Sequence, residues 1–124
     1  MTARRAMGRF ALILLAAALV LGASSVTGKP ITDIRMIQGK WRGQISFTGG
    51  PYEIYYLTIN PDSSLAASWG ITTRHGKVSL EGARTRFTLY IWSGDLQYFA
   101  AGDRRVLILK EDFGTFDAQL TPAP

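Results

Sequence analysis

Over most of the chain, short runs of β-branched and aromatic residues alternate with turn-forming residues, about every 8 to 12 positions. The clearest run covers residues 40–47, in which Trp41, Gly43, Ile45 and Phe47 alternate with polar residues. A period of two places apolar side chains on one face of a strand and polar side chains on the other. The pattern therefore predicts an all-β domain made of antiparallel hairpins.

Turn signals divide this domain into strands. Proline, glycine, aspartate and asparagine set the boundaries, because proline fixes φ and glycine accepts left-handed backbone conformations. An antiparallel sheet of about eight strands can close on itself and so remove its exposed edges. We therefore predict a small antiparallel up-and-down β-barrel or strongly curved meander. The predicted strands are residues 40–47, 52–59, 65–73, 77–81, 85–92, 96–100, 105–110 and 115–120, with turns that include residues 74–76 and 93–95.

The N-terminal end has a different character. Three arginines precede the unbroken apolar run of residues 10–21, and small residues follow it. This order is typical of a secretory signal peptide, whereas a permanent anchor, the alternative, needs about 20 apolar residues. We expect an exported protein, periplasmic or secreted, with no stable membrane anchor after cleavage. The predicted parts are a helical signal peptide (1–25), a tether that could form one helical turn (26–38), the barrel domain (39–121) and a frayed tail (122–124).

Charge and cysteine content narrow the range of partners. The full chain carries a net charge of +5, but removing Arg4, Arg5 and Arg9 from its 14 basic residues leaves 11 against nine acids, or +2. The remaining basic residues form no cluster larger than the pair Arg104-Arg105. We therefore expect no nucleic-acid partner. Because the chain has no cysteine, its domain must be stabilised by its core and not by disulfides.

The segment Gly39-Lys40-Trp41 resembles the G-x-W opening of lipocalin-like and avidin-like barrels. In those families the motif lies at the first strand, and the tryptophan plugs one end of the barrel. The resemblance implies a small exported barrel that can enclose a small ligand. The chain is shorter than an ordinary lipocalin and lacks its late helix. Certain periplasmic protease inhibitors share this style of barrel, so the resemblance also keeps inhibition open as a function.

The residues that usually perform catalysis are scattered. His75 is the only histidine, and it lies between Arg74 and Gly76 in a predicted turn, where we expect it to be solvated. No spacing indicates a facing pair of carboxylates, and no serine lies in a Gly-x-Ser-x-Gly context. We therefore expect no enzymatic activity, no metal site and no cofactor.

The aromatic residues suggest three interpretations of the surface. One strand phase buries Ile91 and ten other large side chains, and it leaves Ile54, Tyr56, Tyr90 and Trp92 outside, with Phe99 as a further candidate. First, bulges could shift the register and bury most of these outer side chains. Second, Ile54, Tyr56, Tyr90 and Trp92 could form a contact surface for a partner or a second copy. The ten other buried side chains are Trp41, Tyr55, Leu57, Ile59, Trp69, Phe87, Leu89, Leu107, Leu109 and Phe116.

In the third interpretation, the opposite phase places Trp69, Tyr90 and Trp92 along a ligand cavity. Aromatic walls with a few polar groups are typical of small-molecule sites. We select these three residues as the predicted ligand-binding site. The predicted function is an exported, non-catalytic binding domain for a small apolar or amphipathic ligand. The alternative is a periplasmic protein-interaction module, either an inhibitor or a homo-oligomer, that uses an outer aromatic face.

Overall fold

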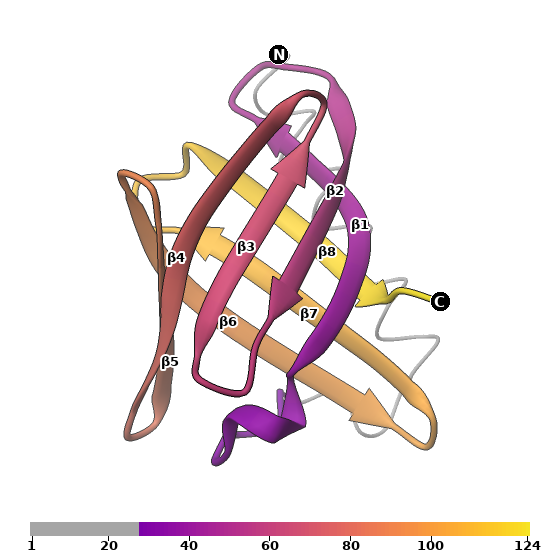
Figure 1. The fold of residues 1–124 in the computed structure, drawn as a ribbon, viewed down its shortest axis with the longest axis vertical. Helices are drawn as coiled ribbons and strands as arrows, with labels where there is room; N and C mark the ends of the chain where they lie inside the picture. Colours follow the sequence, from indigo (N-terminus) through magenta and orange to yellow (C-terminus); the bar gives the residue numbers. More distant parts are fainter. Residues whose placement is uncertain (1–27) are drawn as a thin grey trace.

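The computed structural model describes residues 28–124, so the predicted signal peptide lies outside the described part. Eight antiparallel strands form a closed barrel in which each strand pairs with the next and β8 returns to β1 (Figure 1). The predicted fold class is confirmed. A short 3-10 helix, η2 (Ile34–Met36), precedes the strands β1 (Gly39–Phe47), β2 (Tyr52–Ile59), β3 (Ser64–Trp69), β4 (Thr72–Glu81), β5 (Arg84–Leu89), β6 (Trp92–Ala101), β7 (Arg104–Glu111) and β8 (Phe116–Pro122).

The up-and-down order gives the barrel two different ends. The β1–β2, β3–β4, β5–β6 and β7–β8 connections form one end, which we call the upper end because it lies in the upper part of Figure 1. The helix η2 and the three remaining connections form the other end, which we call the lower end. Successive hairpins necessarily alternate between the two ends, so the residues of alternate turns are brought together by topology alone.

Trp41 closes the lower end. Its side chain is buried, and its indole Nε1 donates a hydrogen bond of 2.8 Å to the carbonyl oxygen of Ile37, just after η2. The guanidinium carbon of Arg105 lies 4.9 Å from the centroid of the Trp41 ring. Nη2 of Arg105 donates a 2.7 Å hydrogen bond to the carbonyl oxygen of Met36. The polar groups of this plug are therefore paired.

Side chains fill the space between the two ends. Inward-pointing residues alternate with outward-pointing ones along each strand, as the pleat requires. A cavity wide enough to hold a water molecule would leave accessible area on the side chains around it. The large inward side chains have almost none, so the barrel is packed along its length. At most 2% of the surface is exposed for Ile45, Tyr55, Leu57, Ile59, Leu65, Phe87, Leu89, Leu107, Leu109, Phe116 and Leu120.

Glycines inside strands allow this small barrel to bend. A Cβ atom on Gly43 would lie 1.8 Å from the carbonyl oxygen of Gln119, on the paired strand β8. A Cβ atom on Gly76 would lie 1.7 Å from the carbonyl oxygen of Thr88, on β5. No larger residue fits where two backbones approach so closely. A glycine inside a strand often marks such an approach and not a turn.

Two predicted turns are wrong, because each contains a glycine, Gly76 or Gly94, that allows a close approach between strands instead of a turn. Residues 74–76 and 93–95 lie inside β4 and β6, and the chain instead turns at residues 70–71 and 90–91. The pairing of β3 with β4 and of β5 with β6 is continuous and contains no bulge. The displaced turns therefore determine which side chains point inward and which point outward. Ile91, predicted to point inward, is therefore exposed at a turn, and so is Ile71.

Other boundaries change less. His75 lies on the outer side of β4, exposed as predicted but not in a turn. The last strand reaches Pro122, and the amide of Ala123 donates a 2.9 Å hydrogen bond to the carbonyl oxygen of Lys40. The barrel therefore extends into the segment that we predicted to be a frayed tail.

Candidate functional site

Trp69, Tyr90 and Trp92 meet at the upper end of the barrel. The ring centroids of Trp69 and Trp92 are 6.1 Å apart, and those of Tyr90 and Trp92 are 5.6 Å apart. Phe47 lies beside both tryptophans, at 5.7 Å from Trp69 and 5.9 Å from Trp92. We call these four residues the aromatic cluster. The structure thus brings the three predicted site residues together. The four residues of the cluster come from β1, β3, β6 and the turn between β5 and β6.

The two tryptophans and the tyrosine of the aromatic cluster lie at different depths. Trp69 is buried and packs against Tyr55 beneath it, with ring centroids 5.5 Å apart. Trp92 is half-buried, because the turn at residues 90–91 directs it inward. Tyr90 is outermost, and 60% of its surface is exposed. The cluster therefore runs from the packed interior to the solvent.

The backbone of Tyr90 is strained. Its φ is 56°, in the left-handed region. Three other two-residue hairpins place glycine at the same first position of the turn, with φ of 56° at Gly70 and 62° at Gly82 and Gly102. A left-handed conformation costs a residue with a Cβ atom about 1–2 kcal/mol. Strain of this kind persists only where the surroundings enforce it, and it is often found at functional sites.

Arg74 contributes a cation to this end of the barrel. Its pairing with the buried Ala67 places it on the inner side of β4. Its guanidinium carbon lies 4.4 Å from the centroid of the Tyr90 ring, a cation–π contact. Nη1 donates a 3.3 Å hydrogen bond to the carbonyl oxygen of Thr73, whereas the buried Nε has no partner among the described residues. Sequence reasoning missed Arg74, because it placed this residue in a turn.

Tyr55 adds a second unpaired polar atom below the aromatic cluster. Its hydroxyl group is buried and has no hydrogen-bond partner within residues 28–124. Burial raises the pKa of Tyr55, because the phenolate would lie away from water. Buried polar groups in native proteins are usually paired, so each exception calls for an explanation. Aromatic walls next to the guanidinium of Arg74 suit a ligand that is mainly apolar and carries a hydrogen-bond acceptor.

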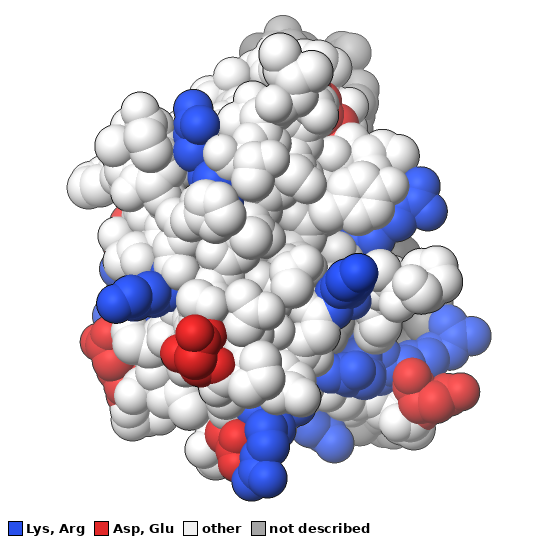
Figure 2. Space-filling view, viewed as in Figure 1, with Lys and Arg blue, Asp and Glu red and all other residues white. Residues whose placement is uncertain are grey.

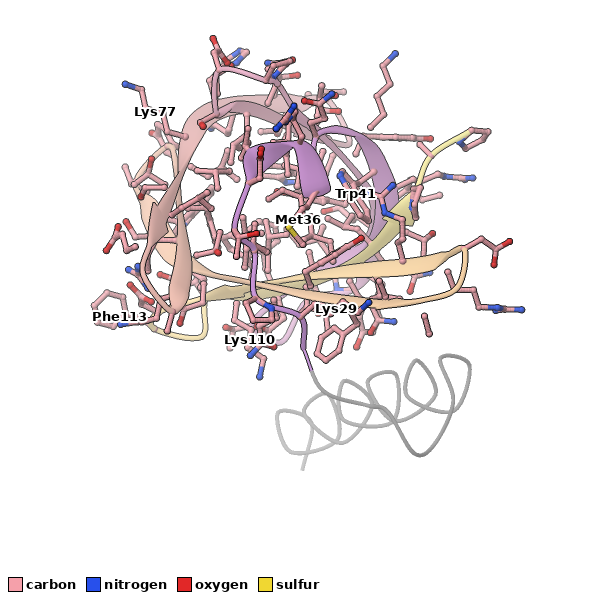
Figure 3. The ribbon with its side chains drawn as sticks, turned by 90° about the horizontal axis from the view of Figure 1, so that it is seen from below. Lys29, Met36, Trp41, Lys77, Lys110 and Phe113 are labelled. Carbon is pink, nitrogen blue, oxygen red and sulfur yellow. The ribbon has the colours of Figure 1, made fainter. Side chains whose placement is uncertain are left out.

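The neighbouring β7–β8 connection displays Phe113 on a rigid turn. Oε1 of the buried Glu111 accepts hydrogen bonds from the backbone amides of Phe113 and Thr115, at 2.9 and 2.8 Å. Asp112 accepts two hydrogen bonds from Arg86, at 2.7 and 2.6 Å, and this pairing lowers the pKa of Asp112. Figure 3 shows Phe113 pointing away from the barrel. The turn therefore holds an apolar side chain in water.

The structure divides the predicted contact surface of Ile54, Tyr56, Tyr90 and Trp92. Ile54 and Tyr56 lie half-exposed on the outer side of β2, where the guanidinium carbon of Arg42 lies 5.8 Å from the Tyr56 ring. Tyr90 and Trp92 belong to the upper end instead. The four residues therefore do not form one face. Phe99 is partly buried against Val106 and Ile108.

The described part of the chain contains neither a cluster of metal ligands nor a membrane-spanning helix. No three histidine, aspartate or glutamate side chains of residues 28–124 come close enough together to hold a metal ion. Within the same residues, no helix has the length and apolar character needed to cross a membrane.

Comparison with known proteins gives no relative: no protein-family model, no curated protein and no solved structure matches the chain. The resemblance of Gly39-Lys40-Trp41 to lipocalin-like and avidin-like barrels therefore stays a prediction. Function has to be argued from the geometry of this chain alone.

Proposed function

We propose that this chain is an exported, non-catalytic binding domain that takes a small apolar or amphipathic ligand at the aromatic cluster. Trp69 and Trp92 would form the apolar wall of the site, and Tyr90 would cover it from the solvent side. Arg74 would contact an acceptor group of the ligand. The packed interior favours a site at the upper end over a cavity deep in the barrel.

The observation that carries this proposal is the position of Tyr90. Its side chain is held in a strained turn, more than half exposed, between the guanidinium of Arg74 and the ring of Trp92. Folding alone does not require a tyrosine there, because Gly70, Gly82 and Gly102 serve the matching turns. A contact with a ligand would account for a residue that the turn itself disfavours.

Binding of a hydrophobic fluorescent probe tests the proposal. Tyr90→Ala should weaken probe binding about threefold to tenfold, because one aromatic contact is worth about 0.5–1.5 kcal/mol. Trp92→Ala should weaken it further and should remove the change in tryptophan emission. Tyr56→Ala is the matched control, since Tyr56 is also an exposed tyrosine beside an arginine but lies outside the site.

The control decides the outcome. Equal loss in the Tyr56→Ala and Tyr90→Ala variants would contradict the proposed site, provided that both variants keep the near-ultraviolet circular dichroism of the folded protein. Mass spectrometry on the protein purified natively from its source would search for a retained ligand. The same spectrum gives the mass of the N-terminus, and a mature chain that begins near residue 26 would support export.

A protein-interaction module, either an inhibitor or a homo-oligomer, is the second candidate. The half-exposed Ile54 and Tyr56 on the outer side of β2 favour it, because exposed apolar residues often mark interfaces. Sedimentation of the purified chain distinguishes the two candidates. A dimer that Tyr56→Ala dissociates, together with no probe binding, would favour this second function.

A further inference from the structure

Three hairpins of the upper end carry a large apolar side chain at the tip. Ile71, Ile91 and Phe113 are 105%, 75% and 92% exposed, respectively. They belong to the β3–β4, β5–β6 and β7–β8 connections, which the barrel topology places at one end. Single exposed apolar residues are normal on a protein surface, but three at the tips of successive alternate turns form a pattern. We call these residues the apolar tips.

The lower end shows no such pattern. Its connections are Asn60-Pro61-Asp62-Ser63, Gly82-Ala83 and Gly102-Asp103, which carry only small or polar side chains apart from one proline. On the face seen in Figure 2, charged side chains also gather over the lower part, whereas uncharged ones cover most of the upper part. The two ends therefore differ in the environment that they favour.

From this arrangement we propose that the upper end docks on the surface of a lipid bilayer, with Ile71, Ile91 and Phe113 entering its apolar layer. The three side chains stand on three separate turns. A protein partner needs a continuous complementary surface of roughly 800 Å² on each side. A fluid bilayer accommodates separate side chains one by one, so it suits the apolar tips better.

The aromatic residues behind the tips fit the same partner. Tyr90 directly precedes Ile91, and Trp92 directly follows it and is half-buried. Tyrosine and tryptophan concentrate at the level of the lipid headgroups, where one part of the ring is apolar and the polar atom stays hydrated. A bilayer entered by Ile91 would thus place its headgroup layer next to Tyr90.

The Phe113 turn supports docking by a preformed surface. Glu111 and Asp112 fix the turn through hydrogen bonds to backbone amides and to Arg86. Phe113 is therefore exposed in the folded state and does not have to be released from the core. Because the apolar tips are uncharged, docking should depend on apolar contact and should persist on neutral lipids at high salt.

The absence of cysteine permits a clean test on the full chain. Ile71→Cys and Phe113→Cys place an environment-sensitive fluorophore at the upper end, and Ala83→Cys and Asp103→Cys place it at exposed turns of the lower end. Each labelled protein is mixed with neutral phosphatidylcholine vesicles. We expect blue-shifted, stronger emission from the two upper-end labels, in low and in high salt, and unchanged emission from the lower-end labels. This comparison reports orientation, whatever the N-terminal segment contributes to binding.

A second set of variants tests the contribution of the apolar tips. Ile71→Ser and Ile91→Ser, each combined with the label at position 113, should lower the vesicle partition coefficient about tenfold, because each removes one aliphatic side chain that docking would bury in the bilayer. Ile54→Ser is the control and should leave it unchanged. Equal responses at both ends, no response at either end, or an upper-end response that appears without vesicles would overturn the proposal. Probe binding at the aromatic cluster is measured separately, so the failure of one proposal is distinguishable from the failure of the other.

Discussion

Replacing Tyr90 by glycine and by alanine separates backbone strain from the contacts of the ring. Both variants lose the ring contacts with Trp92 and Arg74. Only the alanine variant keeps a Cβ atom at a φ of 56°. The comparison of the two variants therefore isolates the cost of the left-handed conformation.

The expected magnitude follows from two opposing effects. Relief of the left-handed strain favours the glycine variant by about 1–2 kcal/mol. The greater backbone freedom of unfolded glycine favours the alanine variant by about 0.5–1 kcal/mol. Tyr90→Gly should therefore be more stable than Tyr90→Ala by about 1 kcal/mol, which corresponds to a difference of roughly 4–8 °C in Tm for a domain of this size.

Urea denaturation of both variants, followed by tryptophan fluorescence, measures this difference as a shift in midpoint at equal slope. Thr88, an exposed residue inside β5, provides the control pair. At that position the alanine variant should be the more stable one, by about 0.5–1 kcal/mol. If alanine is also better at position 90, the turn does not strain Tyr90, and the argument from strain to function fails.

Three further predictions concern the barrel and its upper turns. Gly43→Ala should prevent folding or lower Tm strongly, because its Cβ atom would overlap the backbone oxygen of Gln119; circular dichroism measures the loss. Burial raises the pKa of Tyr55 above that of an unfolded tyrosine, so stability should fall as the pH rises past about 10, and Tyr55→Phe should reduce this fall. Arg86 lowers the pKa of Asp112, so the stabilising effect of this pair should be present above about pH 4 and should be lost as the pH falls through the lowered pKa. Weaker protection of the amides in the Phe113 turn, measured as exchange relative to the intrinsic rate at each pH, would report this loss.

The barrel could be predicted because its pattern is repeated in most of the strands. Alternation in residues 40–47 and the regular spacing of turns specify an antiparallel sheet, and the number of strands suggests closure. The paired strands β1 and β2 are close to their predicted bounds. Local periodicity is sufficient for strands with one dry and one wet face, such as β2 and β3. In β7 it is not, because four consecutive residues from Val106 to Leu109 are buried.

The upper end could be predicted only in part. Trp69, Tyr90 and Trp92 were selected as aromatic residues, yet their meeting depends on turns at residues 70–71 and 90–91 that were not predicted. The second of these turns contains no glycine or proline, so composition does not indicate it. Gly76, in contrast, resembled a turn residue and serves a close approach between strands. Such approaches are properties of the closed barrel and not of any local segment.

The distribution of unfavourable features between the two ends favours function at the upper one. At the lower end, Ser63 in the β2–β3 turn also has a positive φ, of 72°, but the polar atoms of Trp41 and Arg105 are paired around the plug. At the upper end, Tyr90 is strained, Tyr55 and Arg74 have unpaired buried atoms, and three turns expose large apolar side chains. A domain of this size is stable by only about 5–15 kcal/mol, so each of these features takes a measurable part of its stability. The larger number of such features at the upper end is expected if that end is specified by what it contacts, since proteins depart from local rules mainly at functional sites.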